Sequence, residues 1–167
     1  MAVVLAYGGG TNSTALCIEA VKRGLPIDLI VFADTGRRDA EMPETYRYID
    51  QFSDWLVRHG YPPITVVRSA TMGGETLEEN CLRMGRLPSK AYGFKSCSDR
   101  WKVRPCWAEI KRLGMDGGIY IRGIDADESH RCRRADPKPG WSACFALVRS
   151  SKDPNSAASA PLIASPT

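Results

Sequence analysis

Apolar positions along the chain fall into two alternating patterns. Four short runs are mostly apolar, as is typical of parallel strands that are covered on both faces. These runs are residues 2–7, 27–32, 64–68 and 117–122. Between them, apolar residues recur three or four positions apart, which predicts amphipathic helices. The predicted helices are residues 13–23, 43–59, 75–84 and 98–113.

This alternation of strand and helix predicts an α/β fold. Parallel strands in one sheet are joined by right-handed crossovers, so we expect an open, mostly parallel sheet with helices on both faces. In such a sheet, ligands bind outside the carboxyl ends of the strands, at the point where the strand order reverses. The residues that follow the predicted strands are therefore the first candidates for a functional site.

A turn rich in glycine and hydroxyl residues follows the first apolar run. Residues 8–14 read GGGTNST, and a predicted helix comes next. Glycine lets backbone N–H groups approach an anion without a Cβ atom in the way, and a helix N-terminus carries a partial positive charge. The hydroxyls of Ser13 and Thr14 can add donors. The segment predicts a phosphate-binding turn, with a plain connecting turn as the alternative.

Two common phosphate-binding loops do not fit this turn. A Walker loop ends in Gly-Lys-Ser or Gly-Lys-Thr, and no lysine lies between residues 2 and 21. The dinucleotide-binding fingerprint has its third glycine three residues after the second, and that position holds Ser13. If the turn binds phosphate, it therefore belongs to another class of phosphate-binding loop.

Further segments place polar residues beside the ends of predicted elements. Residues 34–36 follow the second predicted strand, and Gly123 follows the fourth. Because the carboxyl ends of parallel strands meet at one edge of a sheet, we expect these segments and the glycine turn to converge on one pocket. Asp34 is a candidate to bind a ribose hydroxyl or Mg²⁺, and a turn former is its alternative role.

Together these segments resemble the phosphoadenosine phosphosulfate (PAPS) reductase-like family of the PP-loop, or adenine nucleotide alpha-hydrolase, superfamily, phage and prophage members included. Residues 8–13 fall on its SGGKDS loop, with both inner glycines and the final serine matched. Residues 32–36, FADTG, and the PETY that follows resemble its second-strand signature. Residues 97–105 resemble its cysteine-to-lysine-proline segment, and Gly123 with residues 128–131 resembles its glycine-to-glutamate-serine-arginine motif.

The resemblance implies a Rossmann-like fold of the PP-loop kind, with ATP or a related adenine nucleotide as cofactor and Mg²⁺ beside it. The residues that it implies for nucleotide binding are Gly8, Gly9, Gly10, Thr11, Asn12, Ser13, Thr14, Asp34, Thr35, Gly36 and Gly123. Lys102, Arg131 and Cys97 are the implied catalytic residues. Lys102 and Arg131 would offset phosphate charge, whereas Cys97 is a nucleophile, a cluster ligand or a buried small residue. No residue is assigned as a metal ligand.

The function we expect is cleavage of ATP between its alpha and beta phosphates, with transfer of the adenylate to an acceptor. The sequence leaves the acceptor open between a nucleic acid and a small molecule. One alternative is a thiol-dependent sulfonucleotide reductase, with Cys97 or Cys144 replacing the cysteine-bearing C-terminal segment of the family's reductases. Another is a non-catalytic nucleotide-binding protein, favoured by Thr11 and Asn12 where relatives carry charged residues.

Composition narrows the class of protein. The formal net charge of the 167-residue chain is +4, which gives only weak attraction to polyanions. No apolar run approaches the ~20 residues that span a bilayer, and the first residues lack the pattern of a secretory signal. We therefore expect a cytoplasmic protein with no membrane partner. A homo-oligomer is compatible with the sequence.

The six cysteines contain no CxxC pair, so an iron–sulfur cluster is a disfavoured alternative. A cytoplasmic location also argues against disulfides. The chain length fits a nucleotide-binding domain over residues 1–149. Residues 150–167 are rich in Ser, Ala and Pro, and this composition predicts a disordered tail.

Overall fold

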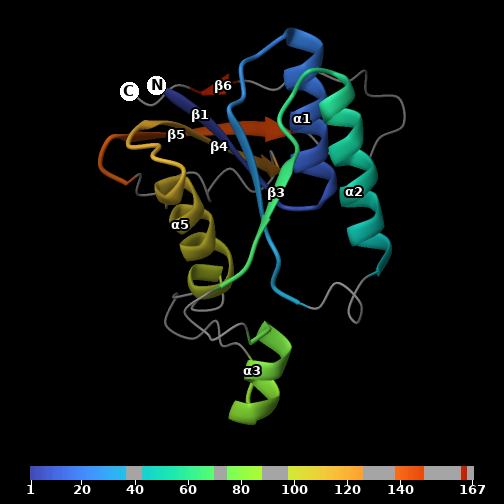
Figure 1. The fold of residues 1–167 in the computed structure, drawn as a ribbon, viewed down its shortest axis with the longest axis vertical. Coiled ribbons are helices and arrows are strands. Elements are labelled where there is room, and N and C mark those ends of the chain that lie inside the picture. The colour runs from blue at the N-terminus through green and yellow to red at the C-terminus, as the bar shows by residue number, and fades with distance from the viewer. Residues whose placement is uncertain (37–42, 70–74, 88–97, 126–137, 149–162, 165–167) are drawn as a thin grey trace.

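The computed structural model describes residues 1–36, 43–69, 75–87, 98–125, 138–148 and 163–164, and at its centre lies a six-stranded sheet (Figure 1). The strand order is β3-β2-β1-β4-β5-β6. The strands are β1 (Ala2–Tyr7), β2 (Leu29–Ala33), β3 (Ile64–Val67), β4 (Gly118–Asp125), β5 (Trp141–Val148) and β6 (Ile163–Ala164). The first five strands are parallel to one another, and β6 runs antiparallel to β5. The predicted open, mostly parallel α/β sheet is confirmed.

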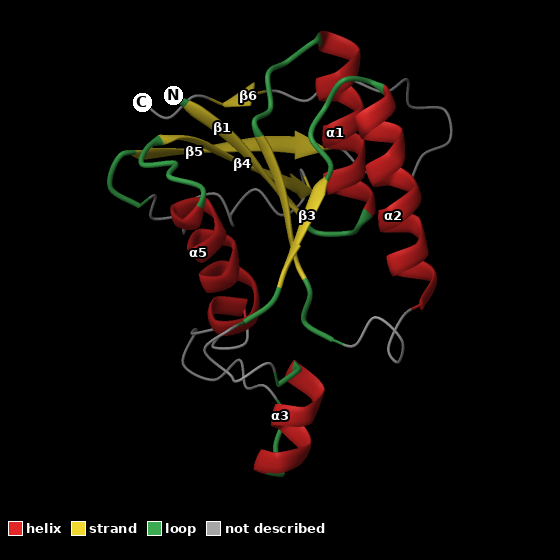
Figure 2. Ribbon diagram, in the orientation of Figure 1, coloured by secondary structure: helices red, strands yellow, loops and turns green. Residues whose placement is uncertain are grey.

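Helices cover both faces of this sheet (Figure 2). They are α1 (Thr11–Arg23), α2 (Pro43–Arg58), α3 (Leu77–Met84), a π-helical turn η3 (Asp99–Val103) and α5 (Arg104–Arg112). α1 and α2 lie on one face and α5 lies on the other, while α3 stands apart from both (Figure 1). None of the described helices is long and apolar enough to cross a membrane.

Alternate side chains of the central strands build two cores. Leu5 of β1 packs on the α1 and α2 side, in a cluster with Leu16 and Ile49. Its neighbour Val4 points to the opposite face, because successive strand residues alternate, and packs in a cluster with Ile110 of α5. Leu5, Val4, Ile49 and Ile110 are almost fully buried. The continuous apolar run of β1 therefore reflects burial on both faces.

One predicted helix has a different form in the structure. Residues 98–113 were expected to form a single α-helix, but the chain makes the π-helical turn η3 before α5 begins at Arg104. The backbone N–H of Arg104 donates to the carbonyl of Asp99, five residues earlier. Pro105 follows directly and has no N–H to donate, so the regular α-helical ladder is interrupted here.

The fifth parallel strand, β5, was missing from the sequence-based prediction. Its residues WSACFALV are apolar enough for a strand, and it pairs with β4 over its whole length. The predicted tail, residues 150–167, lies mostly outside the described residues. Within it, Ile163 and Ala164 form β6 beside Phe145 and Ala146. The boundary at residue 149 stays a prediction.

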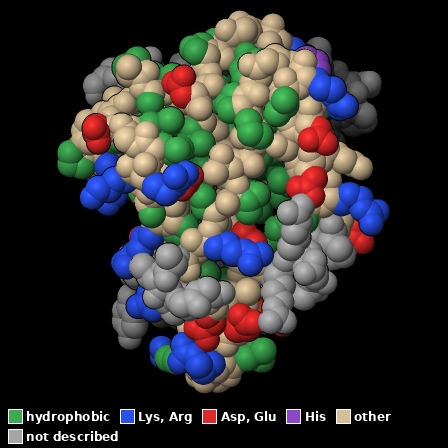
Figure 3. Space-filling model, in the orientation of Figure 1, with side chains coloured by type: hydrophobic (Ala, Val, Ile, Leu, Met, Phe, Trp, Pro, Cys, Tyr) green, Lys and Arg blue, Asp and Glu red, His purple; other side chains and the backbone are tan. Residues whose placement is uncertain are grey.

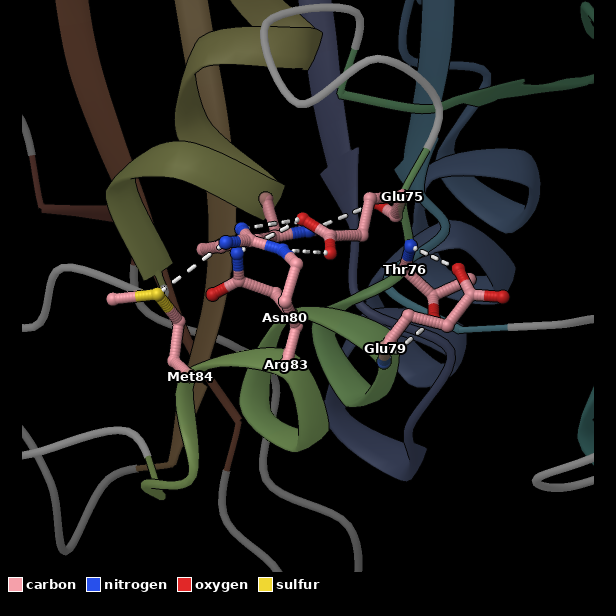
Figure 4. Close-up of polar contacts among 7 residues, drawn as sticks. Glu75, Thr76, Glu79, Asn80, Arg83 and Met84 are labelled. Carbon is pink, nitrogen blue, oxygen red and sulfur yellow. Dashed lines mark hydrogen bonds and ion pairs between the residues drawn. The ribbon is translucent and has the colours of Figure 1, made fainter.

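A compact polar node holds the start of α3 (Figure 4). The side chain of Thr76 accepts a hydrogen bond from the N–H of Glu79, whose carboxylate accepts one from the N–H of Thr76. The Glu75 carboxylate accepts from Arg83 at 2.8 and 3.1 Å and from Asn80 at 2.9 Å. These bonds, with Arg83 the larger contributor, lower the pKa of Glu75 to about 2. None of the residues of α3 is buried, so local polar contacts hold this helix.

The Glu75 node should make the helicity of α3 sensitive to acid. A carboxyl group with a depressed pKa stabilises the fold above its unfolded pKa, here 4.5, and this contribution is lost as the pH falls toward about 2. The NMR Cα shifts of α3 should therefore move toward coil values between these two pH values. Glu75→Gln should produce that shift at neutral pH, whereas Glu78→Gln, on the same helix, should not. Equal effects of both variants would contradict the assignment.

Candidate functional site

A cleft of about 750 Å³ opens at the carboxyl ends of β1, β2 and β4. β1 stands between β2 and β4. The helix α1, which follows β1, covers one face of the sheet, and α5, which precedes β4, covers the other. This is the crevice in which open α/β sheets bind ligands. Of the residues predicted for the site, those that line the cleft are Gly8, Gly10, Thr11, Asn12, Ser13, Thr35, Lys102 and Gly123.

The glycine turn leads β1 into an open helix N-terminus. Gly9 has a φ of +72°, and a Cβ atom there would lie 3.2 Å from the ring of Phe32, so both conformation and space require glycine. Gly10 is the N-cap of α1, and its extended backbone would point a Cβ atom into open space. The first turn of α1 has no side-chain cap and no acidic residue. Its N–H groups therefore face the cleft without a competing acceptor from the cap.

The hydroxyl groups of Ser13 and Thr14 form hydrogen bonds within the turn itself. Ser13 Oγ donates to the carbonyl of Gly10 at 2.9 Å, and Thr14 Oγ1 donates to the same carbonyl at 3.1 Å. Thr14 Oγ1 also lies 2.9 Å from the hydroxyl of Tyr7, and Thr14 is absent from the lining of the cleft. Burial raises the pKa of Tyr7 to about 12. The expected extra donors thus stabilise the turn, and backbone N–H groups are left to meet an anion.

Gly123 lets strand β4 touch the first turn of α1. A Cβ atom at Gly123 would lie 3.0 Å from the carbonyl oxygen of Asn12 and 3.4 Å from the Cα atom of Ser13. Any side chain would push the helix N-terminus away from the sheet. The glycine that the sequence singled out after the fourth strand therefore acts through close packing beside the cleft.

Asp34 has protein partners on both carboxylate oxygens. The residue is 4% exposed, and its Oδ1 accepts hydrogen bonds from the N–H of Gly36, at 3.0 Å, and from the hydroxyl of Tyr46. Its Oδ2 accepts from Arg68 Nε at 2.7 Å. These bonds tie together the ends of β2 and β3 and the start of α2. Neither Asp34 nor Gly36 lines the cleft, so the geometry favours the turn-forming role over a ribose or Mg²⁺ contact.

The wall opposite the turn carries positive charge. Lys102 projects from η3 and is exposed, whereas Arg122 of β4 is partly buried with its guanidinium carbon 5.2 Å from the centre of the Tyr120 ring. Both residues line the cleft. Among the lining residues that the structure describes, none is an Asp or a Glu. Sequence reasoning missed Arg122, because it lies inside a predicted strand rather than in the segment that follows.

Burial makes two of the described cysteines, Cys106 and Cys144, poor nucleophiles. Cys106 lines the cleft, and burial raises the pKa of its thiol to about 11. Burial also raises the pKa of Cys144 on β5. Within the described part of the chain, no group of three His, Cys, Asp or Glu side chains is placed to hold a metal ion. The predicted residues Cys97 and Arg131 lie outside the described residues.

A scan against models of protein families finds no match to this chain, and a search of curated proteins finds none either. The resemblance to the PAPS reductase-like family therefore stays an expectation from sequence.

The two neighbouring glycines should respond differently to substitution. Gly9→Ala should lower the free energy of unfolding by about 1–2 kcal/mol, because the left-handed conformation is strained with a Cβ atom. Gly10→Ser should cost little, since serine is favoured at an N-cap with extended backbone. Urea denaturation of both variants measures the difference. Equal losses of stability would contradict the turn geometry.

Proposed function

We propose that this protein binds an adenine nucleotide in the cleft, with its phosphates at the glycine turn. The observation that carries the proposal is the uncapped N-terminus of α1, which opens into a cleft with Lys102 and Arg122 in its wall and no carboxylate among its described lining residues. Helix N-termini with glycine turns bind phosphate through N–H groups and the helix dipole. Such a wall favours an anionic ligand.

The size and the apolar part of the cleft also suit a nucleotide. A volume of about 750 Å³ lies within the usual range for small-molecule sites. Val31, Phe32 and Ala33 of β2 line the cleft and offer an apolar surface to a base. The resemblance to PP-loop proteins specifies the base as adenine.

The reaction we propose is cleavage of ATP between its alpha and beta phosphates. A nucleophilic oxygen or nitrogen of the acceptor forms a bond to the alpha phosphorus and loses its proton to solvent. The bond from that phosphorus to the bridging oxygen breaks, and its electron pair leaves with pyrophosphate. The N–H groups of the α1 first turn and the Lys102 ammonium would stabilise the charge that develops on the leaving group. Mg²⁺, when bound to the phosphates, would neutralise further charge.

The reductase alternative has no supporting observation among the described residues. A thiol attack on a sulfonucleotide needs a thiolate, and burial holds the thiol of Cys106 protonated at neutral pH. Burial also raises the pKa of the Cys144 thiol, which disfavours its thiolate form. Cys97 and Arg131 keep their proposed roles as predictions from the resemblance alone.

Placing a negative charge at the N-cap of α1 should block nucleotide binding without unfolding the protein. Aspartate and asparagine are both favoured N-cap residues, and a Cβ atom at Gly10 would meet no other atom within 4 Å. Gly10→Asp should weaken ATP binding by about tenfold or more. Its carboxylate would occupy the position of a phosphate at the helix N-terminus and would repel the phosphates of the nucleotide. Gly10→Asn, of nearly equal size, should weaken binding less. Calorimetric titration with ATP measures both, and equal affinities in the two variants would contradict the proposed phosphate position.

Lys102 should contribute to pyrophosphate release. Lys102→Gln should reduce the rate of release from ATP and Mg²⁺ by about tenfold or more, because it removes charge stabilisation from the leaving group. Lys111→Gln removes the same charge from an exposed position of α5 outside the cleft and is the matched control. Release of pyrophosphate is measured in the presence of a small-molecule cell extract as the source of acceptor. Release of inorganic phosphate instead, or ATP binding with no cleavage, would overturn the proposed reaction.

A further inference from the structure

Arg122 projects into the cleft from the side opposite to α1. Its backbone lies beside Ala6 in the parallel pairing of β4 with β1. The next residue, Gly123, faces the first turn of α1, and successive strand residues point to opposite faces. Arg122 therefore lies on the face that α5 covers, together with Tyr120 and Cys106. The glycine turn and Arg122 form two separate walls of the cleft.

Among the side chains that the structure describes, the partner of the Arg122 guanidinium is an aromatic ring. Tyr120 is 6% exposed, and the Arg122 guanidinium lies 5.2 Å from the centre of its ring. Other arginines pair with carboxylates, as Arg68 does with Asp34 at 2.7 Å and Arg104 with Asp99 at 2.6 Å. Among the residues that the structure describes, no carboxylate forms such a pair with Arg122.

A partly buried cation without a counter-charge is unfavourable unless a ligand supplies one. The guanidinium plane matches carboxylate, phosphate and sulfate groups, which it binds with two parallel hydrogen bonds. Contact with the Tyr120 ring limits the positions that the side chain can take. Arg122 therefore offers a binding position to an oxyanion on the face of the sheet opposite to α1.

We propose that Arg122 binds an anionic group of the acceptor, so that the second substrate is a small anionic molecule. This inference rests on the proposed function, in which the turn holds the nucleotide phosphates. A large polyanion fits less well, because nucleic-acid-binding surfaces cluster basic residues. On the face that Figure 3 shows, Lys and Arg side chains are interspersed with Asp and Glu.

Sulfate serves as the probe for this second anion site. The protein is first saturated with the non-cleavable analogue α,β-methylene ATP, which fills the turn, and sulfate is then titrated at constant ionic strength against chloride. Wild-type protein should bind sulfate under these conditions. Arg122→Gln should weaken that binding by about tenfold or more, because a charge-assisted hydrogen-bond pair is lost. Arg122→Lys should keep part of it, and Lys111→Gln should leave it unchanged.

Affinity for the nucleotide analogue shows whether the anion bound by Arg122 belongs to the acceptor or to the nucleotide. If Arg122 serves the acceptor, Arg122→Gln should bind the analogue within about twofold of wild type. A loss of about tenfold or more, as expected for Gly10→Asp, would assign Arg122 to the nucleotide and overturn the inference. So would the absence of sulfate binding to the saturated wild-type protein. Melting temperatures of all variants are compared first, so that misfolding is not read as loss of the site.

Failure of the proposed function has a different signature. If wild-type protein does not bind the analogue at all, the nucleotide assignment fails. Sulfate is then titrated into the Gly10→Asp variant without nucleotide, because the aspartate blocks the turn and leaves the opposite wall accessible. Sulfate binding that disappears when Arg122→Gln is added supports an anion site at Arg122 on its own. Unchanged binding in the double variant would overturn it.

Discussion

The close contact between β4 and the first turn of α1 is the constraint on which the cleft depends. Gly123 permits this contact, because a Cβ atom at this position would lie only 3.0 Å from the carbonyl oxygen of Asn12. On the other side of the turn, Gly9 packs against Phe32 of β2. The N-terminus of α1 is thus held between two strands, and its N–H groups point toward the ligand position instead of being covered by a cap.

The acidic residue Asp34 and the basic residues of the cleft wall have separate roles. The buried carboxylate of Asp34 is neutralised by Arg68 and joins the ends of β2 and β3. The cleft wall keeps Lys102 and Arg122 without an acidic neighbour among the described lining residues. A carboxylate turned into the cleft would compete with an anionic ligand for these cations. Because the carboxylate of Asp34 is bound to Arg68 and does not line the cleft, the charge of the described cleft wall stays positive.

Local patterns predicted most of the fold and part of the site. The apolar runs and the 3.6-residue periodicity indicated the strands and helices, because burial on two faces or on one stripe leaves a direct record in sequence. The turn-forming role of Asp34 was one of two alternatives, and its ion pair with Arg68 was not visible because the two residues are 34 positions apart. Arg122 was missed because a polar residue inside a strand gives no sign of the face it occupies until the pairing with β1 is known.

The π-helical turn η3 connects the cleft wall that carries Lys102 to α3, the helix that stands apart from the sheet. Trp101 in η3 is buried and donates from its indole N–H to the carbonyl of Glu75 at 3.4 Å, while the neighbouring Lys102 reaches the cleft. The N–H of Leu77 donates to the carbonyl of Thr35, another lining residue, at 2.9 Å. The start of α3 is therefore joined to two walls of the cleft. Because no residue of α3 is buried, polar contacts at Thr35 and at the neighbour of Lys102, rather than a shared apolar core, link the start of this helix to the cleft.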